Sequence, residues 1–291
     1  MKFNTKSSHF LILSILLIEI SSCKSSSFSH KNSFESKVDS NALLKEKFHL
    51  AVSAHRGNSK IAPENTLATF QKVLEIGVDY IEIDVRTSKD GQLLILHDGT
   101  LNRTTNGMGA MKNFNLAELK NLSAGKGFGE AFQNEKIPTL EETLVLISEW
   151  NAKHQRKTNL YVDCKDVQAK PLIEQLSKHQ MLKNAVFYGS DDFLFSLKKI
   201  YSKAKLLPAL DSPKEIITKV EKLKPYAFDV RWTIINDSLV NVIHQQKIKV
   251  FSDVLGFIDT PQTYQKAVKM KVDVIQTDHV RKVYQTLLKE K

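Results

Sequence analysis

Residues 80–98 read YIEIDVRTSKDGQLLILHD. Apolar and acidic side chains alternate over residues 80–85, which is the pattern of a β-strand with one buried face. Residues 92–97 also read as a strand, and only the sequence RTSKDG lies between the two. A parallel crossover needs about a dozen residues or more, and Asp-Gly is a frequent hairpin turn. We therefore expect the second strand to return antiparallel to the first.

Outside this hairpin, strand-like runs alternate with amphipathic helical patterns. Residues 50–54 predict a strand, and residues 66–76, between Pro63 and Gly77, carry apolar side chains at helical spacing. Beyond residue 137 the alternation predicts strands at residues 159–163, 185–188, 205–210, 227–230, 248–252 and 272–276. Helical patterns are found at residues 139–150, 171–181, 191–202, from 213, at 236–246, at 261–270 and at the C-terminus.

Without the hairpin return, the predicted strands number eight and share one direction. We therefore predict an α/β fold, a TIM-type (β/α)8 barrel over residues 48–291, with a small insertion after the second-strand hairpin. The insertion covers about residues 99–137, where the alternation breaks and only residues 116–122 favour a short helix; it forms a subdomain or a lid. An open doubly wound sheet is the alternative, and it is disfavoured because no glycine-rich phosphate loop follows the first strand.

The N-terminal segment reads as a leader. Lys2 and Lys6 precede an apolar run at residues 10–18 that is too short to cross a bilayer. The run is followed by Ser-Ser-Cys23, which resembles the signal of bacterial lipoproteins. This resemblance implies a signal peptide at residues 1–22, lipidation of Cys23 and attachment to the bacterial cell envelope, at the periplasmic face or the outer membrane. The alternative is an ordinary secretory signal followed by a chance cysteine.

Residues 23–47 then comprise the lipidated cysteine and a Ser-rich tether. Seven of the seventeen residues in 24–40 are serine, and no apolar period is visible there. The alternative for the end of this segment is a short helix over residues 38–48 that packs on the barrel as a lid.

The composition excludes several classes of protein. A chain of 291 residues with 42% hydrophobic and 25% charged residues is neither intrinsically disordered nor a polytopic membrane protein. Two cysteines rule out a disulfide-built scaffold and a Cys-rich zinc module, and lipidation of Cys23 would leave Cys164 without an intrachain partner. The net charge of +10 suits an anionic partner, but no run of Lys and Arg exceeds two residues. We therefore expect no nucleic-acid partner.

Chemically useful side chains collect where predicted strands end, and on a parallel barrel the active site lies at those ends. The strands end in the sequences His55-Arg56-Gly57, Glu82-Ile83-Asp84, His97-Asp98 and Asp163-Cys164-Lys165. Strand alternation places Glu82 and Asp84 on one face and their apolar neighbours on the other. By the same period Asp163 and Lys165 face inward, whereas Cys164 faces outward and is not expected to be a nucleophile.

The three carboxylates predict a metal site. Glu82, Asp84 and Asp163 at one barrel mouth would repel one another unless a cation lay among them. Ligation by oxygen alone favours one divalent cation of the hard class, Mg²⁺ or Ca²⁺, over zinc.

The basic residues at the same strand ends predict phosphoryl chemistry. His55 and His97 can serve as a general acid and a general base near neutral pH. Arg56 and Lys165 offer positive charge to an anionic substrate oxygen. Each signal alone has a simpler structural explanation. Their convergence favours a phosphoryl-transfer site over a glycosidase or a serine hydrolase.

At these residues the chain resembles the glycerophosphodiester phosphodiesterase family. The matching sequences are HRG at 55–57, PENT at 63–66, YIEIDV at 80–85, KDG at 89–91, LHD at 96–98, TLNRTTNG at 100–107, IPTL at 137–140 and TD at 277–278. The match is dense over residues 52–143, looser to 165, and thin beyond it except near 272–278. The resemblance implies a TIM-type barrel with an insertion.

The resemblance also implies roles for individual residues. It assigns His55 and His97 as the catalytic acid/base pair, and Arg56 and Lys165 as phosphate contacts. Which histidine is the acid and which the base stays open.

Glu82 and Asp84 correspond to metal ligands of the family. The third ligand is usually the Glu of a Glu-Ile-Lys motif, and here the motif reads Asp163-Cys164-Lys165. Because Asp is one methylene shorter, the cation would lie closer to this strand or be bridged by water. Related phospholipase-D-type toxins carry Asp at this position.

The activity implied is metal-dependent hydrolysis of glycerophosphodiesters to sn-glycerol 3-phosphate and an alcohol. The neighbouring glycerol hydroxyl would attack the phosphorus, and water would then open the cyclic phosphate. One alternative is a phospholipase-D-type or lysophospholipid phosphodiesterase on the same barrel. Another is a non-catalytic lipoprotein that binds phosphodiesters or glycans. The expected partners are a small-molecule phosphodiester substrate and, through lipidated Cys23, the membrane; the sequence sets no oligomeric state.

Overall fold

The computed structural model describes residues 41 and 43–290. The predicted signal peptide at residues 1–22 and the predicted lipidation site Cys23 lie outside the described residues. Within residues 43–290, no helix combines the length and the hydropathy that crossing a bilayer requires.

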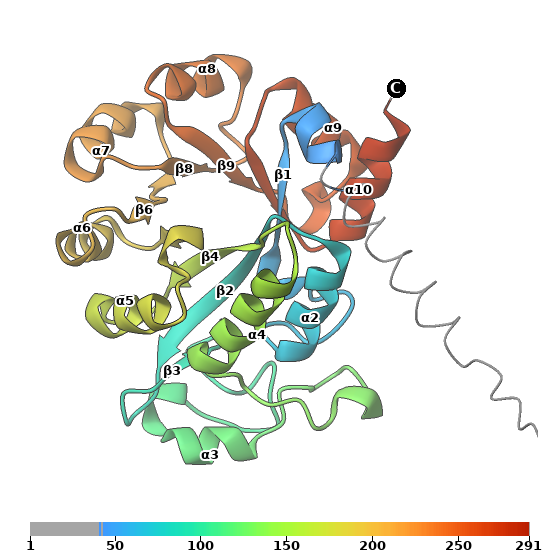
Figure 1. Cartoon of the computed structure of the whole chain (residues 1–291), viewed down its shortest axis with the longest axis vertical. Coiled ribbons are helices and arrows are strands. Elements are labelled where there is room, and N and C mark those ends of the chain that lie inside the picture. The colour runs from blue at the N-terminus through green and yellow to red at the C-terminus, as the bar shows by residue number, and fades with distance from the viewer. Residues whose placement is uncertain (1–40, 42, 291) are drawn as a thin grey trace, which may run out of the picture.

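A parallel sheet forms the centre of the fold (Figure 1). Its strands are β1 (Ala51–Ala54), β2 (Tyr80–Thr87), β4 (Asn159–Cys164), β5 (Ala185–Tyr188), β6 (Lys205–Leu206), β7 (Ala209–Leu210), β8 (Ala227–Val230), β9 (Lys249–Asp253) and β10 (Val274–Thr277). Neighbouring strands follow the order β6-β5-β4-β2-β1-β10-β9-β8-β7. The first and last strands of the chain are therefore neighbours, because β1 pairs with β10 in parallel.

The sheet closes through one passage of chain that the sequence predicts as a single strand, residues 205–210. In the structure it is divided into β6 and β7 by Leu207 and Pro208. The Leu207 N–H donates to the carbonyl of Phe187 at 2.8 Å, and the carbonyl of Pro208 accepts from the Asp229 N–H at 3.0 Å. Proline has no N–H to continue the ladder toward β5, which interrupts the strand. With these bonds eight parallel strands form a closed ring, and the predicted TIM-type barrel is confirmed.

Helices cover the outside of the barrel. They are α2 (Leu67–Ile76), α4 (Leu140–Lys153), α5 (Ala169–Lys178), α6 (Asp191–Ile200), α7 (Ile216–Leu223), α8 (Asp237–Gln245), α9 (Pro261–Lys269) and α10 (Val280–Lys289). Sequence signals fix several of their ends. The hydroxyl of Thr66 accepts the Thr69 N–H at the start of α2, and Gly77 at φ 81° ends that helix. Thr139 and Glu142 form the predicted capping box of α4.

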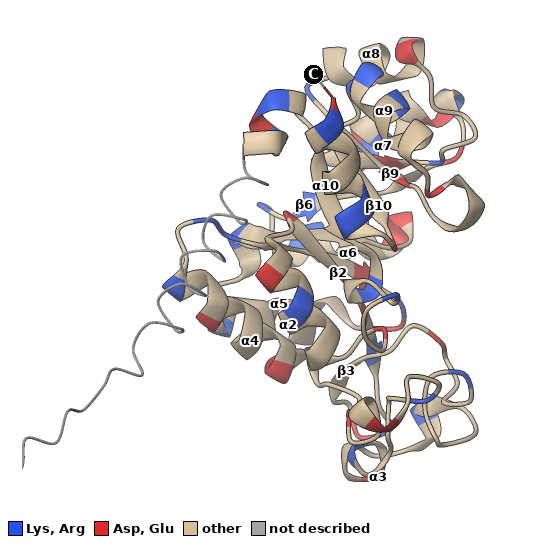
Figure 2. Ribbon diagram, turned by 90° about the vertical axis from the view of Figure 1, so that its right-hand side faces the viewer, with Lys and Arg blue, Asp and Glu red and all other residues tan. Residues whose placement is uncertain are grey.

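The hairpin strand β3 (Leu93–Ile95) pairs antiparallel with β2, as predicted, with Val85 opposite Ile95. The insertion follows it and contains α3 (Leu116–Asn121) and the short 3₁₀ helices η2 (Met111–Asn113) and η3 (Glu130–Phe132). Its apolar residues pack with two leucines of the hairpin in a separate cluster, made of Leu94, Leu96, Leu101, Met111, Leu119, Ala124 and Ile137. Figure 2 shows this part of the chain projecting from one end of the molecule.

The interior of the barrel is divided into two layers. Inward-facing side chains near the N-terminal ends of the strands form an apolar layer of Ala51, Tyr80, Tyr161, Val186, Leu207, Ala227, Phe251 and Val274. Two residues further along each strand the inward positions are mostly polar, as with Ser53, Glu82, Asp163, Asp229 and Asp253. The polar layer opens at the barrel mouth, the end where the C-terminal ends of the strands meet.

A short helix, residues 41 and 43–48, packs at the opposite end of the barrel. Leu44 is buried, and the Asn41 side chain donates to the carbonyl of Ile76 at 2.6 Å. Lys45 forms an ion pair with Asp79 at 2.9 Å. Residues 41, 44 and 45, which the sequence analysis assigns to the tether, therefore pack on the barrel.

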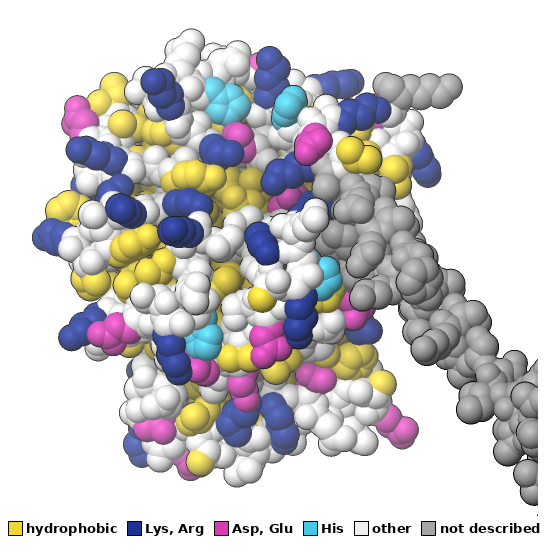
Figure 3. All heavy atoms as spheres, viewed as in Figure 1, with side chains coloured by type: hydrophobic (Ala, Val, Ile, Leu, Met, Phe, Trp, Pro, Cys, Tyr) yellow, Lys and Arg dark blue, Asp and Glu magenta, His cyan; other side chains and the backbone are white. Residues whose placement is uncertain are grey.

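On the face of the molecule shown in Figure 3, Lys and Arg side chains lie interspersed with Asp and Glu. The positive net charge is not gathered into a single patch on this face.

Candidate active site at the barrel mouth

The turn after β1 carries His55 and Arg56 into the mouth. It begins as the 3₁₀ helix η1 (His55–Gly57), and Arg56, Gly57 and Asn58 adopt φ angles of 48°, 75° and 74°. A Cβ atom on Gly57 would lie 2.4 Å from Cγ2 of Thr69, so the contact with α2 requires glycine. The sharp turn directs the main-chain N–H of Arg56 toward β2.

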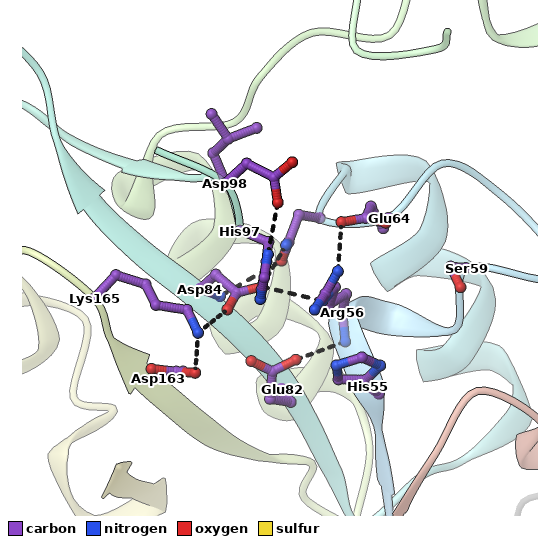
Figure 4. A network of polar contacts seen from close by, with 12 residues as sticks. His55, Arg56, Ser59, Glu64, Glu82, Asp84, His97, Asp98, Asp163 and Lys165 are labelled. Carbon is purple, nitrogen blue, oxygen red and sulfur yellow. Dashed lines mark hydrogen bonds and ion pairs between the residues drawn. The ribbon is translucent and has the colours of Figure 1, made fainter. Parts of the chain in front are cut away.

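Three carboxylates converge beside this turn (Figure 4). Glu82 and Asp84 project from β2, and Asp163 projects from β4, where it lies opposite Asp84 in the parallel register. One oxygen atom from each of the three carboxylates lies within 4.8 Å of the other two. They point inward because alternation commits Ile81 and Ile83 to the core beneath the helices.

Hydrogen bonds hold the two β2 carboxylates in place. Oε2 of Glu82 accepts the main-chain N–H of Arg56 at 2.7 Å. Oδ2 of Asp84 accepts the side-chain amide of Asn65 at 2.7 Å. Asn65 adopts a left-handed φ of 56° just before α2, which aims its side chain at the site.

The three carboxylates repel one another. Burial, and then the charges of Asp84 and Asp163, raise the pKa of Glu82 well above its usual value. Burial also raises the pKa of Asp163, while the neighbouring Lys165 charge opposes the effect. A donor set made only of carboxylate oxygens fits one divalent cation of the hard class, which would offset this repulsion.

The two predicted phosphate contacts lie on either side of the carboxylates. Nζ of Lys165 is 2.5 Å from Asp163 and 3.2 Å from Asp84. The guanidinium of Arg56 donates from Nη1 to Glu64 at 3.0 Å. Its Nε is buried without a hydrogen-bond partner within the described structure and lies 3.6 Å from Asp84. A buried donor of this kind can serve an anionic oxygen of a ligand.

His55 is held by a residue from the far end of the chain. Its Nδ1 lies 2.9 Å from Oδ1 of Asp278, which follows β10. Burial alone would raise the pKa of Asp278, but the hydrogen bond and charge of His55, with Lys60 and Arg56 nearby, lower it. Asp278 is therefore a carboxylate and only accepts, so Nδ1 of His55 carries hydrogen and Nε2 is left for a ligand.

His97 has an equivalent arrangement after β3. Its Nδ1 lies 2.7 Å from Oδ1 of Asp98. The guanidinium of Arg86 donates to the main-chain carbonyl of His97 from Nε at 2.9 Å and from Nη2 at 2.6 Å. The Leu96 N–H donates to the carbonyl of Asp84 at 2.9 Å, which places the histidine at the level of the carboxylates. The hairpin thus brings His97 to the mouth although β3 is outside the barrel ring.

A second acidic group lies across the mouth. Oδ2 of Asp229 accepts the hydroxyl of Tyr161 at 3.0 Å. Oδ1 of Asp253 accepts the side-chain amide of Gln276 at 2.9 Å. Burial is the main cause that raises the pKa of Asp253 to about 6, although the nearby His55 charge lowers it.

The sequence analysis gave no role to four residues that contact the predicted site. They are Glu64, Asn65, Arg103 and Asp278. All four lie in stretches that carry the family resemblance, at 63–66, 100–107 and 277–278. Their places in these motifs could have identified them as candidate site residues. Cys164 faces away from the mouth, as predicted, and is buried in the core between strands and helices.

This chain is similar to known proteins over most of its length. The model of the glycerophosphoryl diester phosphodiesterase family matches residues 55–282. A glycerophosphodiester phosphodiesterase of Caldanaerobacter subterraneus is 54% identical over 98 residues, which cover 34% of this chain and 40% of that protein. A glycerophosphodiester phosphodiesterase of Bacillus altitudinis is 29% identical over 241 residues, which cover 78% of this chain and 94% of that protein.

Solved structures share the fold. A phosphodiesterase of Oleispira antarctica, in complex with the product sn-glycerol-3-phosphate, is 28% identical with a TM-score of 0.74; the match covers 82% of this chain and 97% of that one. A glycerophosphodiester phosphodiesterase of Agrobacterium tumefaciens has a TM-score of 0.72 at 23% identity, over 82% of this chain and 99% of that one, and supports the fold alone.

Proposed function

Because this chain belongs to the glycerophosphoryl diester phosphodiesterase family and is a phosphodiesterase, we propose that it hydrolyses glycerophosphodiesters to sn-glycerol 3-phosphate and an alcohol. The observation that carries the proposal is that two histidines, two basic side chains (Arg56 and Lys165) and three carboxylates meet at one barrel mouth. Each histidine is paired with an aspartate through Nδ1, at 2.9 Å for His55 and 2.7 Å for His97.

We propose that the two histidines exchange protons with the substrate through Nε2. One takes the proton of the glycerol hydroxyl next to the phosphate, and the other gives a proton to the departing alcohol. Water then opens the cyclic phosphate with the roles reversed. The carboxylates of Asp278 and Asp98 support both steps, because a hydrogen-bonded carboxylate stabilises the imidazolium that forms.

Glu82, Asp84 and Asp163 would hold one divalent cation, Mg²⁺ or Ca²⁺. When bound, it would supply positive charge to a phosphoryl oxygen and lower the pKa of the attacking hydroxyl. The buried Nε of Arg56 and the ammonium of Lys165 bind the remaining anionic oxygens of the phosphate.

A second candidate substrate class is favoured by exposed apolar side chains in the insertion and in the loop after β9. Phe257, in the 3₁₀ helix η6 (Gly256–Ile258) after β9, is 94% exposed, and Met108 in the insertion is 76% exposed. These residues would suit the acyl chain of a lysophospholipid, whose cleavage on the same barrel would release its head-group alcohol.

We also propose that Cys23 is lipidated and that the protein is anchored in the bacterial cell envelope. The support is the sequence Ile20-Ser-Ser-Cys23 after a short apolar run. Residue 41, where the described chain begins, lies at the barrel end opposite the mouth.

The test is a substrate panel with purified protein. Glycerophosphocholine, glycerophosphoethanolamine and lysophosphatidylcholine are incubated with enzyme, and sn-glycerol 3-phosphate and free alcohol are both quantified. The proposal expects glycerol 3-phosphate from the first two. Choline release from lysophosphatidylcholine alone would favour the second candidate. Binding without turnover of any diester would replace both with the non-catalytic alternative.

A further inference from the structure

The guanidinium of Arg103, in the insertion, is bound by two carboxylates at once. It donates from Nε and Nη2 to Asp98, at 2.8 and 2.9 Å. It donates from Nη1 and Nη2 to Glu64, at 2.7 and 2.8 Å. Four of its five N–H donors are used in this way, in two paired contacts that only the planar fork of arginine can make.

Each carboxylate has a second partner in the proposed active site. Asp98 accepts from Nδ1 of His97 at 2.7 Å. Glu64 accepts from Nη1 of Arg56 at 3.0 Å. A continuous chain of charged hydrogen bonds therefore runs from His97 to Arg56, through residues of the hairpin, the insertion and the loop before α2. Figure 4 shows both of its ends beside the carboxylate cluster.

Along this series of hydrogen bonds, each negatively charged carboxylate lies between two basic side chains. The hydrogen bond and charge of Arg103, then those of His97, hold the pKa of Asp98 far below its usual value. Burial alone would raise the pKa of Glu64, but Arg103 and Arg56 lower it. Both carboxylates are thus pure acceptors. Nδ1 of His97 must donate, and its Nε2 is free.

We propose that Arg103 is a positioning residue of the active site, which sets the imidazole of His97 and the guanidinium of Arg56 in a fixed relation across the carboxylate cluster. Its side chain is 45% exposed, so its contribution to global stability is small. What it supplies is geometry, because its guanidinium joins the insertion to Asp98 of the hairpin and to Glu64 of the loop before α2. For its kinetic effects the inference rests on the proposed function.

Kinetic measurements can separate the contributions of the hydrogen-bonded residues between His97 and Arg56. Asp98→Asn disturbs the His97 end and is expected to lower kcat with little change in KM. Glu64→Gln disturbs the Arg56 end and is expected mainly to raise KM. Arg103→Ala should do both, with a fall in kcat of about 10- to 100-fold. Arg103→Lys keeps the charge without the paired contacts and is expected to recover little; it also serves if Arg103→Ala does not fold.

The matched control is Arg156→Ala. Arg156 also contacts an aspartate, Asp79 at 3.0 Å, but at the other end of the barrel. This variant should lower the melting temperature while kcat per folded molecule stays unchanged. Arg103→Ala should show the reverse, with a nearly unchanged melting temperature.

A second measurement is independent of turnover. The ¹⁵N spectrum of histidine-labelled, metal-free protein, with the His97 signals assigned through His97→Ala, reports which ring nitrogen carries hydrogen. We expect an Nδ1–H form in the wild type and a mixture in Arg103→Ala. The inference is overturned if both Arg103 variants keep kcat and KM within about twofold of an active wild type, or if the His97 form is unchanged. A wild type inactive on every diester would refute the proposed function, and the spectrum would still decide on Arg103.

Discussion

His55 and Asp278 are 223 residues apart in the chain, yet Nδ1 of one lies 2.9 Å from Oδ1 of the other. The contact exists because the barrel closes between its first and last strands, with Ala54 opposite Thr277 in the register of β1 and β10. A histidine and the carboxylate that fixes its hydrogen are thus brought together only in the complete fold.

This contact gives the first prediction. Asp278→Asn keeps the shape of the side chain but lets it donate to Nδ1, which would move the imidazole hydrogen to Nε2. We expect kcat to fall by roughly 10²-fold or more, since a hydrogen held on Nε2 of the neutral imidazole leaves that atom unable to accept a proton from the substrate. Steady-state kinetics on glycerophosphocholine checks this, with the circular dichroism spectrum as a folding control. Wild-type kcat in the folded variant would show that Asp278 does not set the state of His55.

The second prediction concerns the two histidines. His55→Ala and His97→Ala should each lower kcat by roughly 10²–10⁴-fold, the usual contribution of general acid–base catalysis. The double variant should lose little more, because residues that act as one unit are not additive. Melting temperatures should change little, since both side chains face the mouth. A folded single variant with near wild-type turnover would remove that histidine from the mechanism.

The third prediction concerns the cation. Dialysis against EDTA should abolish activity, and Mg²⁺ or Ca²⁺ should restore it. The added cation should also raise the melting temperature, because it binds the folded carboxylate cluster and relieves its repulsion. Asp163→Glu, which restores the usual family residue, should remain active, whereas Asp163→Asn should need far more cation. Full activity in chelated protein would contradict the proposed metal dependence.

The fourth prediction uses the pKa of Asp253, which burial raises to about 6, against roughly 3.9 for an unfolded aspartate. The folded state therefore holds this proton more tightly. The resulting stabilisation is complete below about pH 4 and is lost as the pH rises through 6. Asp253→Asn removes this dependence. As the pH rises from 4 to 6, the free energy of unfolding of the wild type should therefore fall relative to that of the variant. Urea denaturation of both proteins in EDTA checks this, and parallel curves would argue against it.

The fifth prediction concerns membrane attachment. Cys23→Ser should move the protein from the membrane fraction to the soluble fraction, because the acyl chains would supply the attachment. Cys164→Ser is the matched control and should stay with the membrane, since Cys164 is buried in the barrel. Immunoblotting of fractionated cells expressing each variant measures the partition. Equal partition of both variants would mean that Cys23 does not anchor the chain.

The sequence predicts the barrel and the placement of its carboxylates because local rules determine both. Side chains alternate in direction over residues 80–85. Once Ile81 and Ile83 are buried beneath the helices, Glu82 and Asp84 must therefore point into the barrel. The short link RTSKDG at residues 86–91 likewise permits only a hairpin, which returns His97 to the mouth.

Other features depend on contacts that local patterns do not encode. The pairing of β6 with β5 and of β7 with β8, on either side of Pro208, depends on which strands lie next to each half in the closed barrel. The contact between Glu64 and Arg103 depends on where the insertion packs against the loop before α2. The sequence of the insertion has no apolar periodicity from which that packing could be predicted. The helix at residues 43–48 packs through Leu44 and the partly buried Phe48, whereas Leu43 is exposed, so its apolar pattern is weak beside the Ser-rich segment before it.

The two-layered interior of the barrel has an evolutionary consequence. The apolar layer packs the interior of the barrel at the N-terminal ends of the strands. In it the rings of Tyr80 and Phe251 are in edge-to-face contact, with their centroids 5.4 Å apart. Residues two positions further along the same strands carry most of the charged groups, and their side chains line the barrel mouth rather than that packing. A new specificity can therefore arise by exchange of mouth residues while the lower layer is inherited unchanged. Descendants of one such barrel can diverge in the diester they cleave without passing through an unfolded ancestor.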